Sequence, residues 1–230
     1  MKPKGSKGVI IAVSVIVLWA VETAALLGSS LTVAHPLSWF FLFVQMHLFT
    51  GLFITAHDSM HHAVSANARL NHTIGKVSSV LFMFNNYSNL YKKHHEHHRF
   101  VATEKDPDYH HSGNFFLWYF SFLKQYVSIG QIVLVAILFN LLLLVFEEQR
   151  LLMFWVVPSF LSTLQLFFFG TYLPHRNEHH SADIYKSKSQ FKSHFLAFIA
   201  CYFFGYHYEH HRFPATPWWQ LYKRKEEMEQ

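Results

Sequence analysis

The chain has 230 residues, of which 51% are hydrophobic and 14% are charged, so charged residues fall well short of the quarter found in typical soluble domains. Histidine is enriched at 19 residues, whereas Cys201 is the single cysteine, which excludes a disulfide framework, a four-cysteine zinc site and a cysteine-held iron–sulfur cluster. The length predicts one domain over residues 1–230. The net charge of +5 is compatible with a nucleic-acid partner, and the positions of the charges along the chain decide that question below.

Four apolar stretches are long enough to cross a membrane. They occupy residues 8–27, 37–56, 129–146 and 151–170. A helix needs about 20 such residues to span the hydrocarbon core, and Pro36 suits the start of the second helix because proline fits the first helical turn. Pro158 predicts a kink in the last stretch, of a kind that a helical bundle tolerates. The sequence therefore predicts an all-α integral membrane protein with four transmembrane helices.

The basic residues predict how these helices are oriented. Of the 19 Lys and Arg, all but Arg150 lie in the N-terminal tail, in residues 57–128 or in residues 171–230. Because cytoplasmic segments collect Lys and Arg, both termini and both long segments are predicted to face the cytoplasm. The positive charge then serves orientation and attraction to lipid headgroups, which argues against nucleic acid as a partner.

A histidine cluster occurs twice, as "HHEHHRF" at residues 94–100 and as "HYEHHRF" at residues 207–213. In both copies three histidines stand at positions i, i+3 and i+4, which lie on one side of a helix. Each triplet is therefore predicted to present its imidazoles to one point. Two such helices that face each other would form a metal cage.

A third pair, in "HDSMHH" at the end of the second apolar stretch, has the i, i+4 spacing. The ligands predicted from these spacings are His57, His61, His94, His97, His98, His207, His210 and His211. Eight imidazoles are twice the four that close a structural zinc site, so two metal ions are predicted. Nitrogen ligands without thiolates leave iron, zinc, copper and nickel open.

Two further histidines follow the last apolar stretch. His175 is either a ligand or a hydrogen-bonded side chain at the membrane interface, and His179 or His180 is either a ligand or a loop residue. We include His175 and His179 in the predicted ligand set. Every predicted ligand then lies at or beyond the cytoplasmic end of a membrane helix, so the sequence predicts a His-rich helical cap on that face.

Three carboxylates lie among the predicted ligands: Asp58, Glu96 and Glu209. A metal-bound histidine commonly donates its second N–H to a carboxylate or a carbonyl, so we expect these three to orient the ligands and thereby support catalysis. The alternative is that they are solvated surface charges. For Asp106 and Asp108 in "DPD", a turn and an ion pair with Arg99 or Arg212 both remain open.

A membrane metal-binding or transport protein without enzymatic activity is the alternative from another class. Such a protein should carry a path of ionisable residues through its membrane helices. Only Glu22 and His47 lie inside the predicted spans. The concentration of histidines at one membrane face favours catalysis over transport.

The three histidine boxes resemble those of the membrane-bound di-iron fatty acid desaturase and hydroxylase superfamily. Further stretches resemble the bacterial and cyanobacterial β-carotene ketolases within it, over about residues 8–222. These stretches are "FITAHDSMH" at 53–61, "DPDY" at 106–109, "FFLWY" at 115–119, "FFGTYLPHR" at 168–176, "FGYHYEHHRFP" at 204–214 and "PWWQL" at 217–221. The boxes alone identify the superfamily, whereas "GTYLPHR" and "PWWQL" are typical of ketolases.

The resemblance implies two non-haem iron ions held by the histidine boxes, O2 as co-substrate and electrons from an external donor such as reduced ferredoxin. It implies a carotenoid substrate, whose β-ionone ring is hydroxylated twice at the 4-position methylene before loss of water leaves the ketone. A fatty-acyl or other lipid desaturase or hydroxylase on the same iron site is the alternative enzyme. Where ketolases carry a further histidine after the LPH motif, this chain has "DIYKSKSQ", so His179 is the expected substitute.

Overall fold

The computed structural model describes residues 6–176 and 183–230, and these residues form helices joined by turns and loops, with one isolated bridge between Ser189 and Tyr206. The helices in chain order are α1 (Lys7–Leu27), α2 (Pro36–Met60), α3 (Ala68–Leu81), α4 (Tyr87–Phe100), α5 (Phe115–Tyr126), α6 (Ile129–Leu142), α7 (Glu148–Leu151), η1 (Leu152–Val156), α8 (Val157–Leu166), η2 (Phe167–Tyr172), α9 (Leu173–His175), α10 (His194–Cys201), α11 (His207–Arg212), η3 (Trp218–Gln220) and α12 (Leu221–Glu229). The prediction of an all-helical membrane protein is confirmed.

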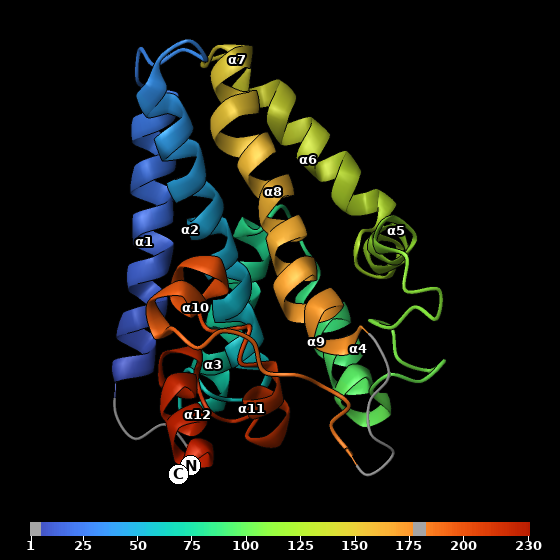
Figure 1. Cartoon of the computed structure of the whole chain (residues 1–230). Helices are drawn as coiled ribbons and strands as arrows, with labels where there is room; N and C mark the ends of the chain where they lie inside the picture. Colours follow the sequence, from blue (N-terminus) through green and yellow to red (C-terminus); the bar gives the residue numbers. More distant parts are fainter. Residues whose placement is uncertain (1–5, 177–182) are drawn as a thin grey trace.

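Three helices are long and apolar enough to cross a membrane: α1, α2 and the continuous run Glu148–His175 from α7 to α9 (Figure 1). They contain three of the predicted spans. At its start α2 is capped by the His35 side chain, which accepts a hydrogen bond from the Leu37 amide, and Pro36 occupies the first turn. No glycine or proline interrupts α2 near residue 56, so the helix continues past the predicted end to Met60 and includes His57.

The remaining predicted span, residues 129–146, differs from the structure. The helix α6 ends at Leu142, and its 14 residues extend only about 21 Å, less than the hydrocarbon core of roughly 30 Å. It is preceded by α5, which is bent from α6 by 84° at a short break. Ser128 causes the break in part, because its hydroxyl caps α6 by accepting the Gln131 amide. Among the described residues the membrane-crossing helices number three, or four if this bent pair forms one span.

The run from α7 to α9 contains two π-helical segments, η1 and η2, on either side of α8. Pro158 stands in the first turn of α8, directly after η1. Proline has no N–H to continue the α-helical hydrogen bonds, and a wider π-turn is one way in which a helix accommodates that loss. The predicted disturbance at Pro158 is therefore a change of helical pitch within one continuous span.

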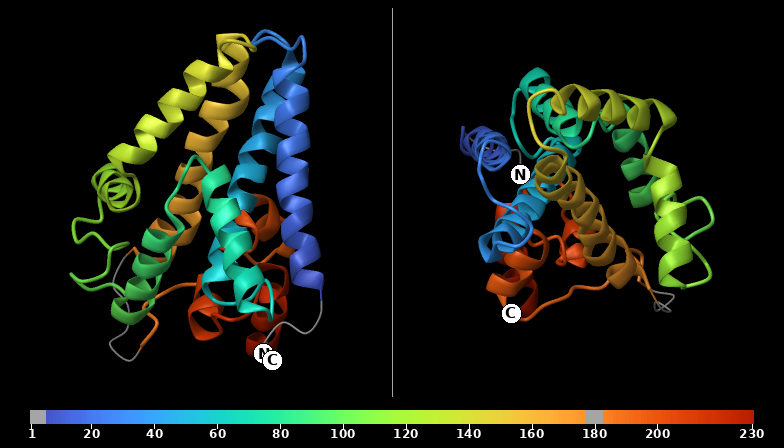
Figure 2. Two further views of the ribbon diagram at one scale, coloured as in Figure 1. Left: turned by 180° about the vertical axis from the view of Figure 1, so that it is seen from behind. Right: turned by 90° about the horizontal axis from the view of Figure 1, so that it is seen from above.

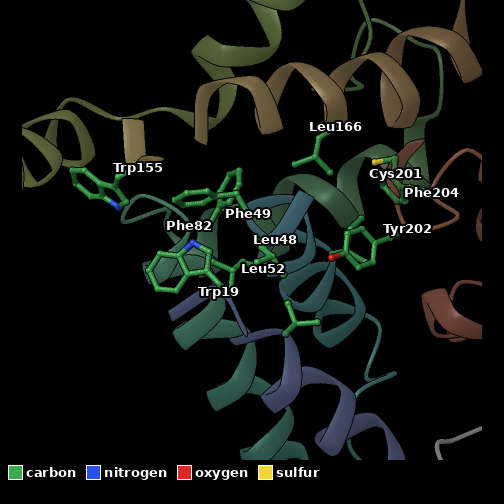
Figure 3. Close-up of a cluster of buried hydrophobic side chains, with 12 residues drawn as sticks. Trp19, Leu48, Phe49, Leu52, Phe82, Trp155, Leu166, Cys201, Tyr202 and Phe204 are labelled. Carbon is green, nitrogen blue, oxygen red and sulfur yellow. The ribbon is translucent and has the colours of Figure 1, made fainter. Parts of the chain in front are cut away.

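The helix α2 lies at the centre of the molecule and packs against α1, α3 and α8. Its partners contribute large side chains to one apolar cluster (Figure 3), in which the rings of Trp19 and Phe49 meet edge to face at 5.5 Å. Leu52 of α2 and Leu166 of α8 belong to the same cluster. This core fixes the direction in which the end of α2 points.

The short helices α3, α4, α9, α11 and α12 gather at one end of the long helices, where α1 also begins (Figures 1 and 2). Gly170 allows one of the close approaches there, because a Cβ at this position would lie 2.2 Å from the Phe204 ring. Phe204 in turn packs edge to face on the His57 ring at 4.9 Å. The absence of a side chain at position 170 thus helps to position the histidine end of the bundle.

Candidate metal centre and its cavity

Four elements bring histidines together at this end: the last turn of α2, α4, α9 and α11. Two groups result, and in each the candidate ligand atoms all lie within 4.8 Å of one another. The first cluster consists of His57, His61, His94 and His210. The second cluster consists of His97, His175, His207 and His211.

His98 lies between the two clusters. Its Nε2 atom is 3.1 Å from Nε2 of His94 and 3.0 Å from Nε2 of His210, and its ring centre is 4.3 Å from that of His211. The shortest approaches thus join His98 to the first cluster. Of the ten predicted ligands, His179 lies outside the described residues, and the structure assembles the other nine.

The repeated triplets are divided between the two clusters, although we expected each triplet to converge on one point. His94 and His98 of α4 face the first cluster while His97 faces the second. Helical geometry explains the division, because residues i and i+4 differ by about 40° around the axis while i and i+3 differ by about 60° in the other direction. Each of the two helices therefore supplies ligands to both sites.

His97 has the best-defined carboxylate partner. Its Nδ1 atom lies 2.9 Å from Oδ1 of Asp106 and 3.8 Å from Oδ2 of Asp108, and the Asp106 and His97 side chains are buried. The other Asp106 oxygen accepts the Ala102 amide at 2.8 Å, which fixes the carboxylate in turn. The sequence left Asp106 open between a turn and an ion pair with Arg99 or Arg212, and its contact with His97 emerges only from the structure.

The predicted carboxylates occupy three different environments. Asp58 is buried, with Oδ1 3.5 Å from Nδ1 of His57 and Oδ2 accepting the Trp218 amide at 2.9 Å. Glu96 has a side chain 40% exposed that pairs with Lys92 at 3.9 Å. Glu209 is buried, and its Oε1 lies 3.7 Å from Nζ of Lys225 on α12.

The second cluster also has a backbone partner. Nδ1 of His175 lies 2.8 Å from the carbonyl oxygen of Lys186, an acceptor suited to orienting an imidazole whose Nε2 faces a metal. His47, by contrast, stacks on Tyr202 with ring centres 4.2 Å apart and belongs to neither cluster.

The electrostatics of the site favour neutral imidazoles, the form that binds metals. Burial, together with the neighbouring histidines, lowers the pKa of His94, His98 and His210 well below the ordinary histidine value. At His97 burial also lowers the pKa, but the charges of Asp106 and Asp108 outweigh it and the pKa is raised. The Asp106 contact would therefore increase the basicity of His97 as a ligand.

The donor set fits metal ions. The ring nitrogens of His61 and His94 approach to 2.6 Å, and both ring nitrogens of His57 are buried without a hydrogen-bond partner. Burying polar nitrogens in this way is costly unless something binds them. Converging, buried and neutral imidazoles are ligands for Fe, Zn, Cu or Ni, so the residues present fit the two metal ions that the sequence predicts.

An apolar cavity of about 320 Å³ leads to both clusters. Its lining includes residues of α2, α5, α6 and α8, together with His57 and His94 of the first cluster and His97 and His207 of the second. Near His97 the wall is polar, since the Tyr126 hydroxyl donates to Asp108, whose pKa is raised to about 6 by burial. The cavity can thus hold an apolar molecule with one end beside the histidines.

The family profile described as "Fatty acid desaturase" matches residues 34–136 and 122–230. The chain is 36% identical to a zeaxanthin 4-ketolase of Chlamydomonas reinhardtii, with 94% of this chain and 52% of the relative covered. It is 39% identical to a beta-carotene ketolase of Haematococcus lacustris, with 86% of this chain and 65% of the relative covered. The chain therefore spans between about half and two thirds of the length of these algal relatives.

A bacterial relative matches along most of its own length. The beta-carotene ketolase of Paracoccus sp. (strain PC1) is 35% identical, and the alignment covers 90% of this chain and 88% of the relative. No solved structure matches the chain significantly. The profile match and the long alignments together show that the chain belongs to the fatty acid desaturase family and, within it, is a homologue of the β-carotene ketolases.

Proposed function

We propose that this protein is a β-carotene 4-ketolase, a membrane oxygenase with two iron ions in its histidine clusters. The observation that carries the proposal is the apolar cavity that is lined by histidines of both clusters at once. The relatives described as ketolases support the substrate class. The reaction converts the 4-position methylene of a β-ionone ring into a ketone through two hydroxylations and the loss of water.

The proposed topology has four spans, with the bent pair of α5 and α6 providing the third, and a single domain over residues 1–230. The histidine end, including α4, α11 and α12, then forms a cap on the cytoplasmic side together with both termini. The charge distribution supports this sidedness, because Arg150 is the one basic residue in the two short links at the opposite end. There Arg150 donates to the carbonyl of Ser29 and joins the two links.

In this proposal the first cluster, with His98, holds one iron and the second cluster holds the other, while His179 is a further candidate ligand. When bound and supplied with O2 and electrons, the ferrous ions would oxidise an unactivated C–H bond. The carboxylate of Asp106 keeps His97 oriented, and the carbonyl of Lys186 does the same for His175. Asp58 is positioned to support His57.

The cavity contributes positioning and the exclusion of water. Phe53, Phe82 and Leu166 line it with apolar surface that suits a hydrocarbon ring. Asp108 and Tyr126 provide the hydrogen-bonding groups near His97, where an oxygen newly introduced on the ring can be held. Each hydroxylation consumes one O2, two electrons and two protons and releases one water, and the double hydroxylation product loses a further water to give the ketone.

The electrons must come from outside the chain, and reduced ferredoxin is the proposed donor. Exposed Lys92, Arg99 and Lys223 lie on α4 and α12 at the histidine end, where they would complement an acidic carrier. Lys225 contributes less, since its side chain is 11% exposed and pairs with Glu209. Reconstitution with ferredoxin and its reductase, compared with other reductants, tests this partner.

The first experiment is pigment analysis after expression in a bacterial host that accumulates β-carotene. Red-shifted, more polar keto products are expected from the parent chain and none from a His210→Ala variant. Unchanged β-carotene, from folded and iron-loaded protein supplied with ferredoxin, would overturn the carotenoid assignment. Altered lipid acyl chains in the same cells would instead establish the desaturase or hydroxylase alternative.

A further inference from the structure

The cavity at the histidines adjoins a second one. Its neighbour, of about 430 Å³, is a more open groove between α6 and η1. Three residues line both spaces: Val127 at the bend between α5 and α6, Gln131 of α6 and Val156 of η1. At this junction the Gln131 side chain donates to the carbonyl of Met83 at 2.8 Å, so its amide is satisfied within the protein. The two spaces therefore adjoin each other at these three residues.

The groove runs along α6, away from the histidine end. Beyond the junction it is lined by Ala136, Phe139 and Asn140 on α6 and by Leu152 on η1. From Gln131 to Asn140 the helical rise gives a length of roughly 14 Å. In Figure 1, α6 stands apart from α8 at its α5 end and approaches it toward α7, and none of the α6 residues is fully buried. The groove thus follows the membrane-crossing direction and faces the surrounding lipid.

The chemistry of the groove suits an elongated, apolar occupant. Its lining is mainly aliphatic and aromatic, and the Asn140 amide is turned back onto the Ala136 carbonyl at 2.8 Å. The inner cavity of about 320 Å³ lies at the lower end of the roughly 300–1,000 Å³ range that holds drug-sized ligands. A cyclic end group fits that space, whereas a long polyene attached to it needs further room, which the adjoining groove provides.

We infer that the groove between α6 and η1 binds the polyene chain of the carotenoid substrate while one ring lies in the cavity beside the histidines. The inference rests on the proposed function and deepens it, because it places the substrate along α6 across the bilayer rather than flat beneath α5. The polyene contributes to binding by burying apolar surface in the groove. The second ring of the carotenoid then lies toward the α7 end. Residues of the groove then select substrates by chain length.

Ala136→Trp tests the inference because it fills the groove at a small, exposed position. Ile137→Trp is the matched control, since Ile137 is the next residue, is 52% exposed and does not line the groove. Two assays are run on the parent and the variants. The first measures turnover of β-carotene and of the short ring compound β-ionone. The second measures, by absorbance, the β-carotene that the protein retains during purification. Iron content and thermal stability are compared in parallel.

For Ala136→Trp we expect a loss of about tenfold in β-carotene turnover and retention, with β-ionone turnover and iron content unchanged, because the added ring overpacks the chain site. Ile137→Trp should match the parent. Equal β-carotene retention by the two variants would overturn the groove assignment, as would an equal loss of both substrates in Ala136→Trp. If the parent oxidises neither compound, the proposed function fails, and the retention assay still decides the groove.

Discussion

In the second histidine cluster all four histidines are buried, and His97 is held by Asp106 at 2.9 Å. In the first cluster His61 is partly exposed, and the carboxylate nearest to His57, that of Asp58, lies at 3.5 Å, beyond the usual hydrogen-bond distance. The same type of ligand is thus supported tightly on one side and loosely on the other. We expect the first cluster to exchange metal more readily and the second to depend strongly on its orienting partners.

The largest expected effect comes from removing one ligand of either cluster. His97→Ala in the second cluster and His210→Ala in the first should each abolish ketone formation and lower bound iron from about two ions per chain to about one, because each cluster is built to hold a separate ion. Iron analysis of purified protein measures this, with exposed His111→Ala as the control. An active variant with full iron content would remove that histidine from the ligand set.

The next largest effect is expected when the carboxylate beside each cluster is replaced. Asp106→Asn should lower metal affinity or turnover by about 10- to 100-fold, as loss of a ligand's orienting partner usually does. Asp58→Asn should have a smaller effect because its contact with His57 is longer. Chelator competition on the two variants measures the difference. Equal losses would mean that the two clusters are supported alike.

A smaller effect concerns α11, which supplies ligands to both clusters. Lys225 of α12 pairs with buried Glu209, so Lys225→Met leaves that carboxylate without its cation and should destabilise the fold by about 1–3 kcal/mol. Lys223→Met, on the exposed face of α12, is the matched control. Thermal unfolding in detergent measures both variants, and equal stability would show that the pair does not anchor α11.

The smallest effect is expected at Glu96. Its side chain is 40% exposed, and its pairing partner Lys92 is 75% exposed, so an ion pair of this kind contributes little. Glu96→Gln should change iron content and turnover less than about twofold, within the usual range for exposed pairs. A loss comparable with that of Asp106→Asn would restore Glu96 to the role of orienting a ligand.

The membrane helices could be read from the sequence because each depends on local composition, and α1 begins and ends within one residue of the predicted 8–27. The α6 helix could not, since its apolar run continues to Phe146 while the helix stops at Leu142. Hydropathy records which residues prefer lipid, whereas the bend before α6 depends on the cap at Ser128 and on packing. The role of Asp106 required contacts between segments and was likewise unreadable.

The sequence alone identified the histidines that gather in the two clusters, because the spacings i, i+3 and i+4 place them near one side of a helix whatever that helix packs against. In the structure the i, i+4 pairs stay together. His57 with His61 and His94 with His98 lie at the first cluster, and His207 with His211 lies in the second. Tertiary structure alone decided that the third member of each triplet serves the other cluster, since α4 and α11 each lie between two sites. Only the packing of α2, α4, α9 and α11 could turn one predicted cage into two.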